Sequence, residues 1–376
     1  MKKHPEVFIC AGEASGDQHA SALIRAIRSQ NSDIALHGVA GPQMVKEGCR
    51  ALHRMEELNV MGIGDVIRAL PRISRIEKSL LSYLEANRPD IAILVDFPGF
   101  NMRLGKKLRA MGIPVVHYIA PKLWAWGSWR VKKIKQSQDT LASILPFEEQ
   151  WFGKRGIDVT YVGNPSAIEC RSGWGRDELC QRLGIGGNNK LIALLPGSRP
   201  GELARHVPLM AELNREIKKR YPDAIAVTSR APGVSDEQLR PLLDSGVVLI
   251  DRQQTGYALP VDAAIAASGT ATLELALWDV PTVLVYRGTP MMMWLARKLV
   301  KLRCAGLANI ILGDEPVMPE LLQEEATVEN ILRELVPILE GDASAKQRQK
   351  FSELKEILTD KNPSEELAKI VLKQLS

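Results

Sequence analysis

Short apolar runs alternate with helical patterns along the whole chain. In the first part the runs, which are largely apolar on both faces, cover residues 7–11, 91–95, 115–119, 141–145 and 159–162. Apolar runs of this length, separated by amphipathic helices, predict parallel strands in a sheet that helices cover on both faces. The first part of the chain is therefore expected to be a doubly wound α/β domain.

The pattern pauses at Gly163–Pro165 and at the polar stretch Arg171–Arg176, and a second series then begins. Its apolar runs cover residues 191–195, 224–228, 247–250, 263–267 and 282–285. We therefore predict two α/β domains, over residues 1–165 and 166–342. The charged tail, residues 343–376, has helical periodicity, and we expect it to pack back onto the first domain.

Composition narrows the class of protein. The chain has 376 residues, a net charge of +5 and a pI of about 8.9, which favours anionic partners. Its five cysteines form no C-x-x-C pair and its six histidines no H-x-x-x-H pair, so we expect no metal site. No apolar run approaches the roughly 18 residues of a membrane-spanning helix. We expect a cytoplasmic protein that can still bind a membrane surface.

Ligands of parallel sheets bind beyond the carboxyl ends of the strands, which directs attention to four strand exits. The first exit carries Gly12, Glu13, Ser15, Gly16 and Asp17. Its glycines allow close backbone approach, and we expect Asp17 to cap the following helix. The spacing is not G-x-G-x-x-G, so a nicotinamide dinucleotide is not indicated. A plain glycine turn remains the alternative.

Asp96 stands at the second exit, directly after residues 91–95. A carboxylate in this position could act as a general base toward a substrate hydroxyl. It could equally cap the turn before the next helix, and position alone leaves both interpretations open.

The third exit follows residues 191–195 and carries Gly197, Ser198 and Arg199. Gly197 is expected to expose backbone N–H groups, Ser198 adds a hydroxyl, and the guanidinium of Arg199 can bind phosphate with two hydrogen bonds. The spacing of a Walker A loop is absent, which disfavours ATP hydrolysis. We favour a phosphate-binding loop over a solvated turn.

Ser268, Gly269 and Thr270 follow residues 263–267 and begin a helix at the fourth exit. The free N–H groups of such a helix start can receive a diphosphate. Glu274 lies one turn farther on the same face, where its carboxylate could accept ribose hydroxyls. The alternative is an acidic residue that only stabilises the helix.

Two basic apolar segments, residues 60–75 and 291–303, are typical of the surface of an anionic membrane. The side chains predicted to meet the membrane are Ile63, Val66, Ile67, Leu70, Met293, Trp294 and Leu295. Core packing with arginines that extend to solvent is the alternative for both segments.

In their order along the chain, these motifs resemble the lipid-A-disaccharide synthases, bacterial glycosyltransferases that join two acylated glucosamines. The resemblance covers nearly the whole chain. It runs through residues 11–17, 38–42, 56–63, 96–101, 117–118, 124–126, 145–148, 195–199, 268–271 and 286–287.

The resemblance implies a GT-B fold, in which two Rossmann-like domains face a cleft and the C-terminal helix returns to the first domain. It implies UDP-2,3-diacylglucosamine as donor and 2,3-diacylglucosamine 1-phosphate (lipid X) as acceptor, with no cofactor and no metal. The products would be the β-1′,6-linked disaccharide 1-phosphate and UDP. The enzyme would lie on the cytoplasmic surface of the inner membrane.

The resemblance also assigns roles to residues. Asp96 would be the base and Arg199 a contact of the UDP phosphates. The remaining donor-site residues would be Gly197, Ser198, Ser268, Gly269, Thr270, Glu274, Asn309, Gln323 and Glu324.

Two other functions are compatible with parts of the sequence. A UDP-sugar epimerase would share the fold but would leave the two basic apolar segments unexplained. A non-catalytic membrane- or nucleic-acid-binding protein would use the positive charge, yet aromatic residues for base stacking make up only 5% of the chain. A homodimer is left open as the oligomeric state.

Overall fold

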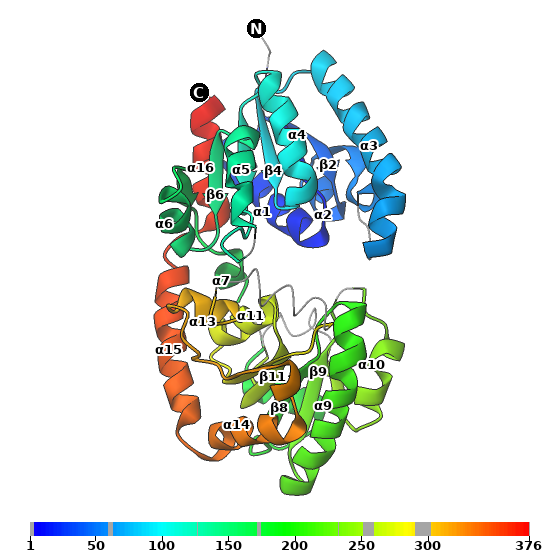
Figure 1. Ribbon diagram of the computed structural model, residues 1–376, viewed down its shortest axis with the longest axis vertical. Helices are drawn as coiled ribbons and strands as arrows, with labels where there is room; N and C mark the ends of the chain where they lie inside the picture. Colours follow the sequence, from blue (N-terminus) through cyan, green and yellow to red (C-terminus); the bar gives the residue numbers. More distant parts are fainter. Residues whose placement is uncertain are drawn as a thin grey trace. The chain divides into compact units, whose positions relative to one another are not determined.

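The computed structural model describes residues 4–58, 63–125, 127–170, 174–231, 233–250, 259–289 and 302–375; the side chains of residues 63–68 and 169 are not described. The chain divides into two compact units (Figure 1). One contains Met1–Pro165 together with Asp360–Ser376, and the other contains Ser166–Thr359.

The first unit is built on a seven-stranded sheet whose strands are all parallel. Its strands are β1 (Glu6–Ala11), β2 (Ala35–Ala40), β3 (Arg50–Arg54), β4 (Ile91–Val95), β5 (Val115–Tyr118), β6 (Thr140–Ser143) and β7 (Val159–Tyr161). They lie in the order β3-β2-β1-β4-β5-β6-β7, so the strand order reverses between β1 and β4. Ligands of doubly wound sheets bind at this reversal.

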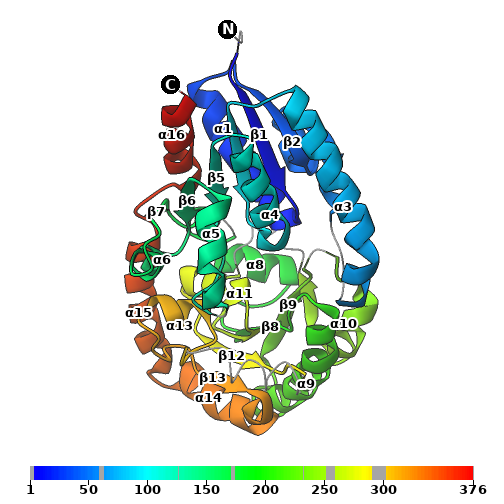
Figure 2. The same ribbon diagram turned by 45° about the horizontal axis from the view of Figure 1, so that its top comes forward.

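Helices cover both faces of the first sheet. They are α1 (Ala14–Gln30), α2 (Pro42–Lys46), α3 (Ile63–Ala86), α4 (Pro98–Ala110), α5 (Val131–Ser137), α6 (Phe147–Gly153) and α16 (Pro363–Leu375), with 3-10 turns η1 (Met55–Glu57) and η2 (Ser128–Arg130). Alternate residues of β1 face opposite cores. Val7, Ile9 and Ala11 pack with α1 and α16, whereas Phe8 and Cys10 pack with α3 and α4. Figure 2 shows α16 beside α1.

The second unit repeats this design on a six-stranded parallel sheet. Its strands are β8 (Leu191–Leu195), β9 (Ile225–Ser229), β10 (Val248–Ile250), β11 (Ala263–Ala267), β12 (Thr282–Tyr286) and β13 (Glu320–Leu322). The order is β10-β9-β8-β11-β12-β13, with the reversal between β8 and β11. The predicted α/β class, with two doubly wound sheets, is confirmed.

Helices of the second unit are α7 (Pro165–Glu169), α8 (Arg176–Leu183), α9 (Pro200–Arg220), α10 (Asp236–Leu243), α11 (Thr270–Leu277), α13 (Leu307–Ile311), α14 (Val328–Glu340) and α15 (Ala343–Leu358), with the 3-10 turn η3 (Gln323–Glu325). Ile192 and Leu194 of β8 pack with α9, α10 and α14 on one face, and Leu191 and Ala193 pack with α8 and α11 on the other.

The tail differs from the expectation that residues 343–376 would all return to the first domain. Phe351, Leu354 and Leu358 of α15 are buried against α11 and α13 of the second unit. Leu367 and Val371 of α16 enter the core of the first unit instead. The tail therefore divides near residue 360, because its two helices present apolar faces to two different cores.

Three strands that the apolar pattern did not predict complete the sheets. β2 contains His37 and Gly38, and β3 has arginine at both ends and is partly exposed along its length. β13 has only three residues. β3 and β13 are edge strands, where one-sided pairing tolerates polar residues, so neither produces a buried apolar run. In β2, position 38 requires glycine, because a Cβ atom on Gly38 would lie 1.7 Å from the carbonyl oxygen of Ile9.

Candidate active site

The exits of β4 and β5 have strained backbone. Asp96, Phe97 and Ile119 adopt positive φ angles of 46°, 48° and 71°, a conformation that residues other than glycine rarely take. The side chain of Asn101, which is fully buried, donates from Nδ2 to the carbonyl oxygens of Val95 (3.1 Å) and Asp96 (2.8 Å). Strain of this kind persists only where surrounding contacts hold it, and it concentrates at functional sites.

The electrostatic surroundings of Asp96 suit a base. Burial raises the pKa of its carboxyl, while the Lys122 ammonium and the Phe97 N–H group act in the opposite direction. A raised pKa brings a carboxylate closer to neutral pH, where a general base is most effective. The Asp96 N–H donates to the carbonyl of Tyr118 (2.8 Å), which fixes the turn to the neighbouring strand.

The loop after β1 lies against the turn that carries Asp96. A Cβ atom on Gly12 would come within 2.5 Å of the Phe97 ring, so only glycine allows this packing. Gly16 is buried, whereas Glu13 and Ser15 are exposed at the start of α1. β1 and β4 pair directly, with Ala11 opposite Val95. The structure thus brings together the two exits that the sequence singled out in this half.

The prediction for Asp17 is wrong. Its carboxylate does not cap α1 but accepts hydrogen bonds from the N–H groups of Gly41 (3.1 Å), Gln43 (3.0 Å) and Met44 (3.0 Å) at the start of α2. Asp17 lies in the first turn of α1 itself, whose N-cap is Glu13. A buried carboxylate needs donors, and α2, 24 residues or more away in sequence, supplies them.

A second buried carboxyl lies beyond β6. Glu148, at the start of α6, is 1% exposed and accepts a hydrogen bond from Nε1 of Trp124 (2.8 Å). Its other oxygen, Oε2, has no hydrogen-bond partner among the described residues. Burial raises the pKa of Glu148 to about 8, against the opposing effects of the Trp124 hydrogen bond and the Lys122 charge. Lys122 thus acts on both Asp96 and Glu148.

In the second unit, the loop after β8 lies beside the loop after β11. Gly197 has φ of 104°, and a Cβ atom on it would lie 3.5 Å from Cβ of Ala267, the last residue of β11. This proximity joins the third and fourth exits of the sequence analysis. The side chain of Arg199 is 81% exposed, so most of its guanidinium is accessible to an anion.

The sequence led us to expect that the backbone N–H groups of this loop are free to bind a ligand, but two of them already have a partner in the protein. Those of Ser198 and Arg199 both point to Oε2 of Glu202, at 3.3 Å each. Oε1 of the same carboxylate accepts from Nη1 of Arg199 (3.0 Å). Glu202 is the third residue of α9 and reaches back over the helix start, the geometry of a capping box.

His206 holds the loop after β8 in place through two hydrogen bonds. Its ring is fully buried, with Nδ1 2.9 Å from the carbonyl oxygen of Pro196, and Nε2 accepts the N–H of Arg287 (2.8 Å). The pair of contacts requires a neutral ring with its proton on Nδ1. Burial lowers the pKa of His206, which favours that form. The histidine therefore ties the exit of β8 to the segment after β12.

Ser268 and Gly269 follow β11, an inner strand of the second sheet, and lead into α11, which begins at Thr270. Gly269 and Thr270 are exposed, and Oγ of Ser268 donates to the carbonyl oxygen of Ala305 (3.2 Å). The N–H groups at this helix start lie at the positive end of the helix dipole. Glu274 is half-buried one turn farther on, as the helical spacing predicted.

Asn309 and Gln323 differ in what they offer. Asn309 is fully buried; its Nδ2 donates to Met318 (2.9 Å) and Glu320 (2.7 Å), and its Oδ1 accepts the N–H of Met318 (2.9 Å). Gln323 has a positive φ of 55° at the exit of β13, and its Nε2 has no partner among the described residues. Glu324, beside it, is exposed. Asn309 therefore organises the loop, and Gln323 is the side chain with an unused donor.

Of the predicted membrane side chains, Leu70 alone is described, and it is 48% exposed on α3. Those of Ile63, Val66, Ile67, Met293, Trp294 and Leu295 lie outside the described side chains. No described helix is long and apolar enough to cross a membrane.

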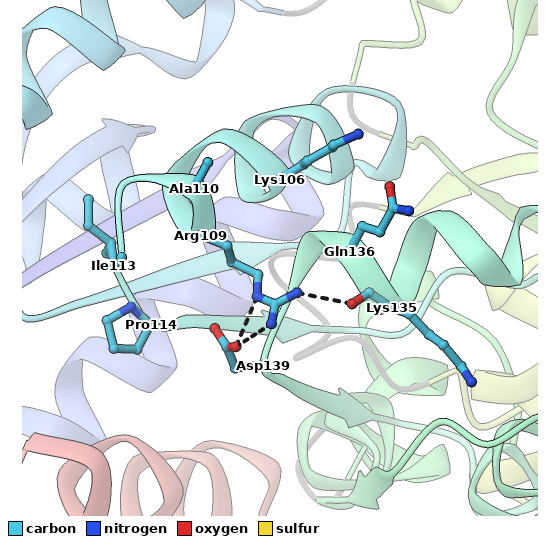
Figure 3. A pocket seen from close by; sticks show the side chains of 9 residues that line it. Lys106, Arg109, Ala110, Ile113, Pro114, Lys135, Gln136 and Asp139 are labelled. Carbon is cyan, nitrogen blue, oxygen red and sulfur yellow. Dashed lines mark hydrogen bonds and ion pairs between the residues drawn. The ribbon is translucent and has the colours of Figure 1, made fainter.

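Two hollows of the described residues lie away from these strand exits. One, of about 540 Å³, lies between α4 and α5 at the amino ends of β5 and β6 (Figure 3). There Arg109 is held by Asp139 (2.8 Å) and by the carbonyl oxygen of Lys135 (3.0 Å). The other lies between α9 and α14. Neither contains a residue that the sequence analysis proposed for the site.

Comparison with known proteins decides the family. A family model described as lipid-A-disaccharide synthetase matches residues 7–374. The lipid-A-disaccharide synthase of Myxococcus xanthus (strain DK1622) is 38% identical over 338 residues, which is 89% of this chain and 88% of that protein. The chain belongs to this family. It is therefore a glycosyltransferase of bacterial lipid A biosynthesis.

Solved structures extend the likeness to the fold. The glycosyltransferase of kitacinnamycin has a TM-score of 0.62 at 12% identity, covering 99% of both chains. The UDP-GlcNAc 2-epimerase from Neisseria meningitidis, bound to UDP-GlcNAc, has a TM-score of 0.60 at 15% identity, covering 98% of this chain and 99% of that one. At such identities the likeness is one of fold, and it confirms the predicted GT-B class.

Four side chains of the site received no role from the sequence: Trp124, Glu148, Glu202 and His206, although Trp124 and Glu148 lie within motifs of the family resemblance. Glu202 had a usable signal, because a glutamate three residues after a helix N-cap often reaches back to cap it. His206 had no such signal and Glu148 was marked only by a family motif, since the importance of both comes from burial and from partners distant in sequence.

Proposed function

We propose that this member of the family condenses UDP-2,3-diacylglucosamine with 2,3-diacylglucosamine 1-phosphate (lipid X). The products are UDP and lipid A disaccharide 1-phosphate with a β-1′,6 linkage, and the anomeric centre is inverted. The first unit takes the acceptor and the second unit takes the donor. The observation that carries the proposal is the position of Asp96. This strained, half-buried residue lies where the strand order of the first sheet reverses, in a chain that belongs to this family.

In the proposed mechanism the 6-hydroxyl of the acceptor loses its proton to the Asp96 carboxylate and attacks the donor's anomeric carbon from the side opposite UDP. The bond from that carbon to the UDP oxygen breaks, and its electron pair leaves with UDP. The raised pKa of Asp96 supports the transfer of the proton to its carboxylate. The exposed guanidinium of Arg199 and the N–H groups at the start of α11 support the second, because they can stabilise charge on the diphosphate.

The remaining donor-site roles belong to the same proposal. Gly197 and Ser198 would lie against the diphosphate, and Glu274 would accept hydrogen bonds from the ribose. Gln323, with its unused amide donor, would contact the donor beside Glu324. The hydrogen bonds of Asn309 favour a role in holding the loop over direct contact with the donor, because its side-chain amide already binds Met318 and Glu320.

We also propose that the enzyme binds the membrane surface peripherally, because both sugars carry acyl chains. The exposed Leu70 on α3, a helix that carries several arginines, supports this location. The segment around Met293, Trp294 and Leu295 is proposed as the second contact on the basis of its sequence.

The decisive experiment measures UDP release from the diacylated donor with and without lipid X. We expect rapid release only when lipid X is present, together with a tetraacyl disaccharide 1-phosphate identified by mass spectrometry. A UDP-sugar epimerase would instead change the configuration of the donor sugar without lipid X. Absence of UDP release with both substrates present would reject the proposed reaction.

A further inference from the structure

The loop after β8 already contains an anion of its own. The Glu202 carboxylate accepts from the N–H groups of Ser198 and Arg199 at 3.3 Å and from Nη1 of Arg199 at 3.0 Å. It lies directly over Gly197, where a Cβ atom would approach Oε2 to 2.7 Å. A carboxylate therefore already occupies donors of this loop.

These three donors are of the kind that bind phosphate oxygens. Backbone N–H groups at a glycine turn and an arginine guanidinium are the usual partners of a diphosphate. Glu202 is 8% exposed, so its carboxylate has little access to water, whereas the Arg199 side chain is 81% exposed. A diphosphate that enters the loop must share the Arg199 charge with Glu202 or displace it.

Helix capping does not account for all of the Glu202 contacts. In a capping box, the residue at this position binds the N–H of the N-cap residue, here Arg199. The additional contacts to the Ser198 N–H and to the Arg199 guanidinium extend toward the strand exit. Glutamine serves equally in a capping box, so the charge of Glu202 is separable from its role in starting α9.

We propose that Glu202 is an internal substitute for the donor's diphosphate. It holds the loop and Arg199 in place when the site is empty, and it competes with the diphosphate for Arg199 when UDP is bound. Its charge therefore weakens UDP binding and speeds the release of this product. The inference rests on the proposed function, in which this loop binds UDP.

The test compares UDP binding by the wild-type chain, Glu202→Gln and Glu212→Gln, using isothermal titration calorimetry. Glu212 is an exposed glutamate on the same helix, so its variant controls for the loss of one negative charge. We expect Glu202→Gln to lower the Kd for UDP about tenfold, the effect of one freed charged contact. We expect Glu212→Gln to match the wild type. In steady-state assays the Glu202→Gln variant should have a lower KM for the donor and stronger inhibition by UDP.

Each other outcome has a distinct meaning. Equal or weaker UDP binding by a folded Glu202→Gln variant would overturn the inference and leave Glu202 as a helix cap. If the glutamine variant does not fold, Glu202→Met, which is uncharged and of similar length, removes the cap together with the charge; tighter UDP binding by it would still support the inference, and weaker binding would overturn it. No UDP binding by the wild-type chain would contradict the proposed function itself, independently of Glu202.

Discussion

Asp96 illustrates how a single residue acquires chemistry from its backbone. Two consecutive residues with positive φ, Asp96 and Phe97, turn the chain sharply at the end of β4. Asn101 holds that turn by hydrogen bonds to the carbonyl oxygens of Val95 and Asp96, and these bonds do not involve the aspartate carboxylate. A residue held in this way can lose its charge without loss of the fold.

We therefore expect Asp96→Asn to fold normally and to lower kcat about 10²- to 10⁴-fold, the usual contribution of a general base. Initial rates of UDP release, with circular dichroism and Tm as controls for folding, measure this. Turnover near the wild-type value would remove Asp96 from the role of base.

Glu148 makes a prediction about pH. Burial raises the pKa of its carboxyl from 4.5 to about 8, so between these values the folded protein keeps a proton that the unfolded chain has lost. The stabilising effect of that bound proton is complete below about pH 4.5 and is lost as the pH rises through 8.

Glu148→Gln can still accept the Trp124 N–H but does not ionise. Its Tm relative to the wild type should therefore increase from pH 5 to pH 8.5, by about 10 °C. Differential scanning fluorimetry across this range makes the comparison. Parallel Tm curves for the two proteins would mean that Glu148 ionises normally in the folded state.

Among the elements, helix starts dominate the candidate site. The same local device, a strand followed by a glycine-containing turn and a helix, occurs after β1, β8 and β11. Local sequence was sufficient to predict these turns, because glycine and capping residues are read over a few positions. It was not sufficient to predict the partners of the polar side chains near these turns: Asp17, after β1, binds the start of α2, and Glu202 fills the turn after β8.

Helix α3 gives a test of membrane binding. Leu70 on α3 and Val45 on α2 are similarly exposed, at 48% and 49%, so the second is a matched control for the first. We expect Leu70→Asp to reduce binding to anionic vesicles several-fold, about the cost of one lost apolar contact. We expect Val45→Asp to leave binding unchanged. Sedimentation with phosphatidylglycerol vesicles measures both, and equal losses would exclude a specific role for α3.

At the scale of the molecule, the tail distributes its two helices between two cores. α15 completes the second unit and α16 completes the first. Amphipathic periodicity predicted both helices but could not say which core each would join. Periodicity records only that one face is buried, whereas the partner of that face depends on tertiary packing.

This division predicts separate responses to core truncation. Leu367 in α16 and Leu335 in α14 are both fully buried, one in each unit. Each leucine-to-alanine change should cost about 2–5 kcal/mol of local stability. Hydrogen exchange should accelerate in β1, β4 and α1 for Leu367→Ala, and in β8, β11 and α9 for Leu335→Ala. Acceleration of the same amides by both variants would contradict two separate cores.

The class of fold, the strands buried on both faces and the family could all be predicted from the order of the residues. Buried parallel strands require unbroken apolar runs, and family motifs are defined by residues in a fixed order along the chain. The strands and the family can therefore be predicted without a structure. The partners of polar side chains became clear only from the folded structure: Asp17 caps α2, the amide of Asn309 is hydrogen-bonded, and Glu202 accepts the N–H groups of the loop after β8. Burial leaves such groups no water, so each must take the donors that folding places beside it.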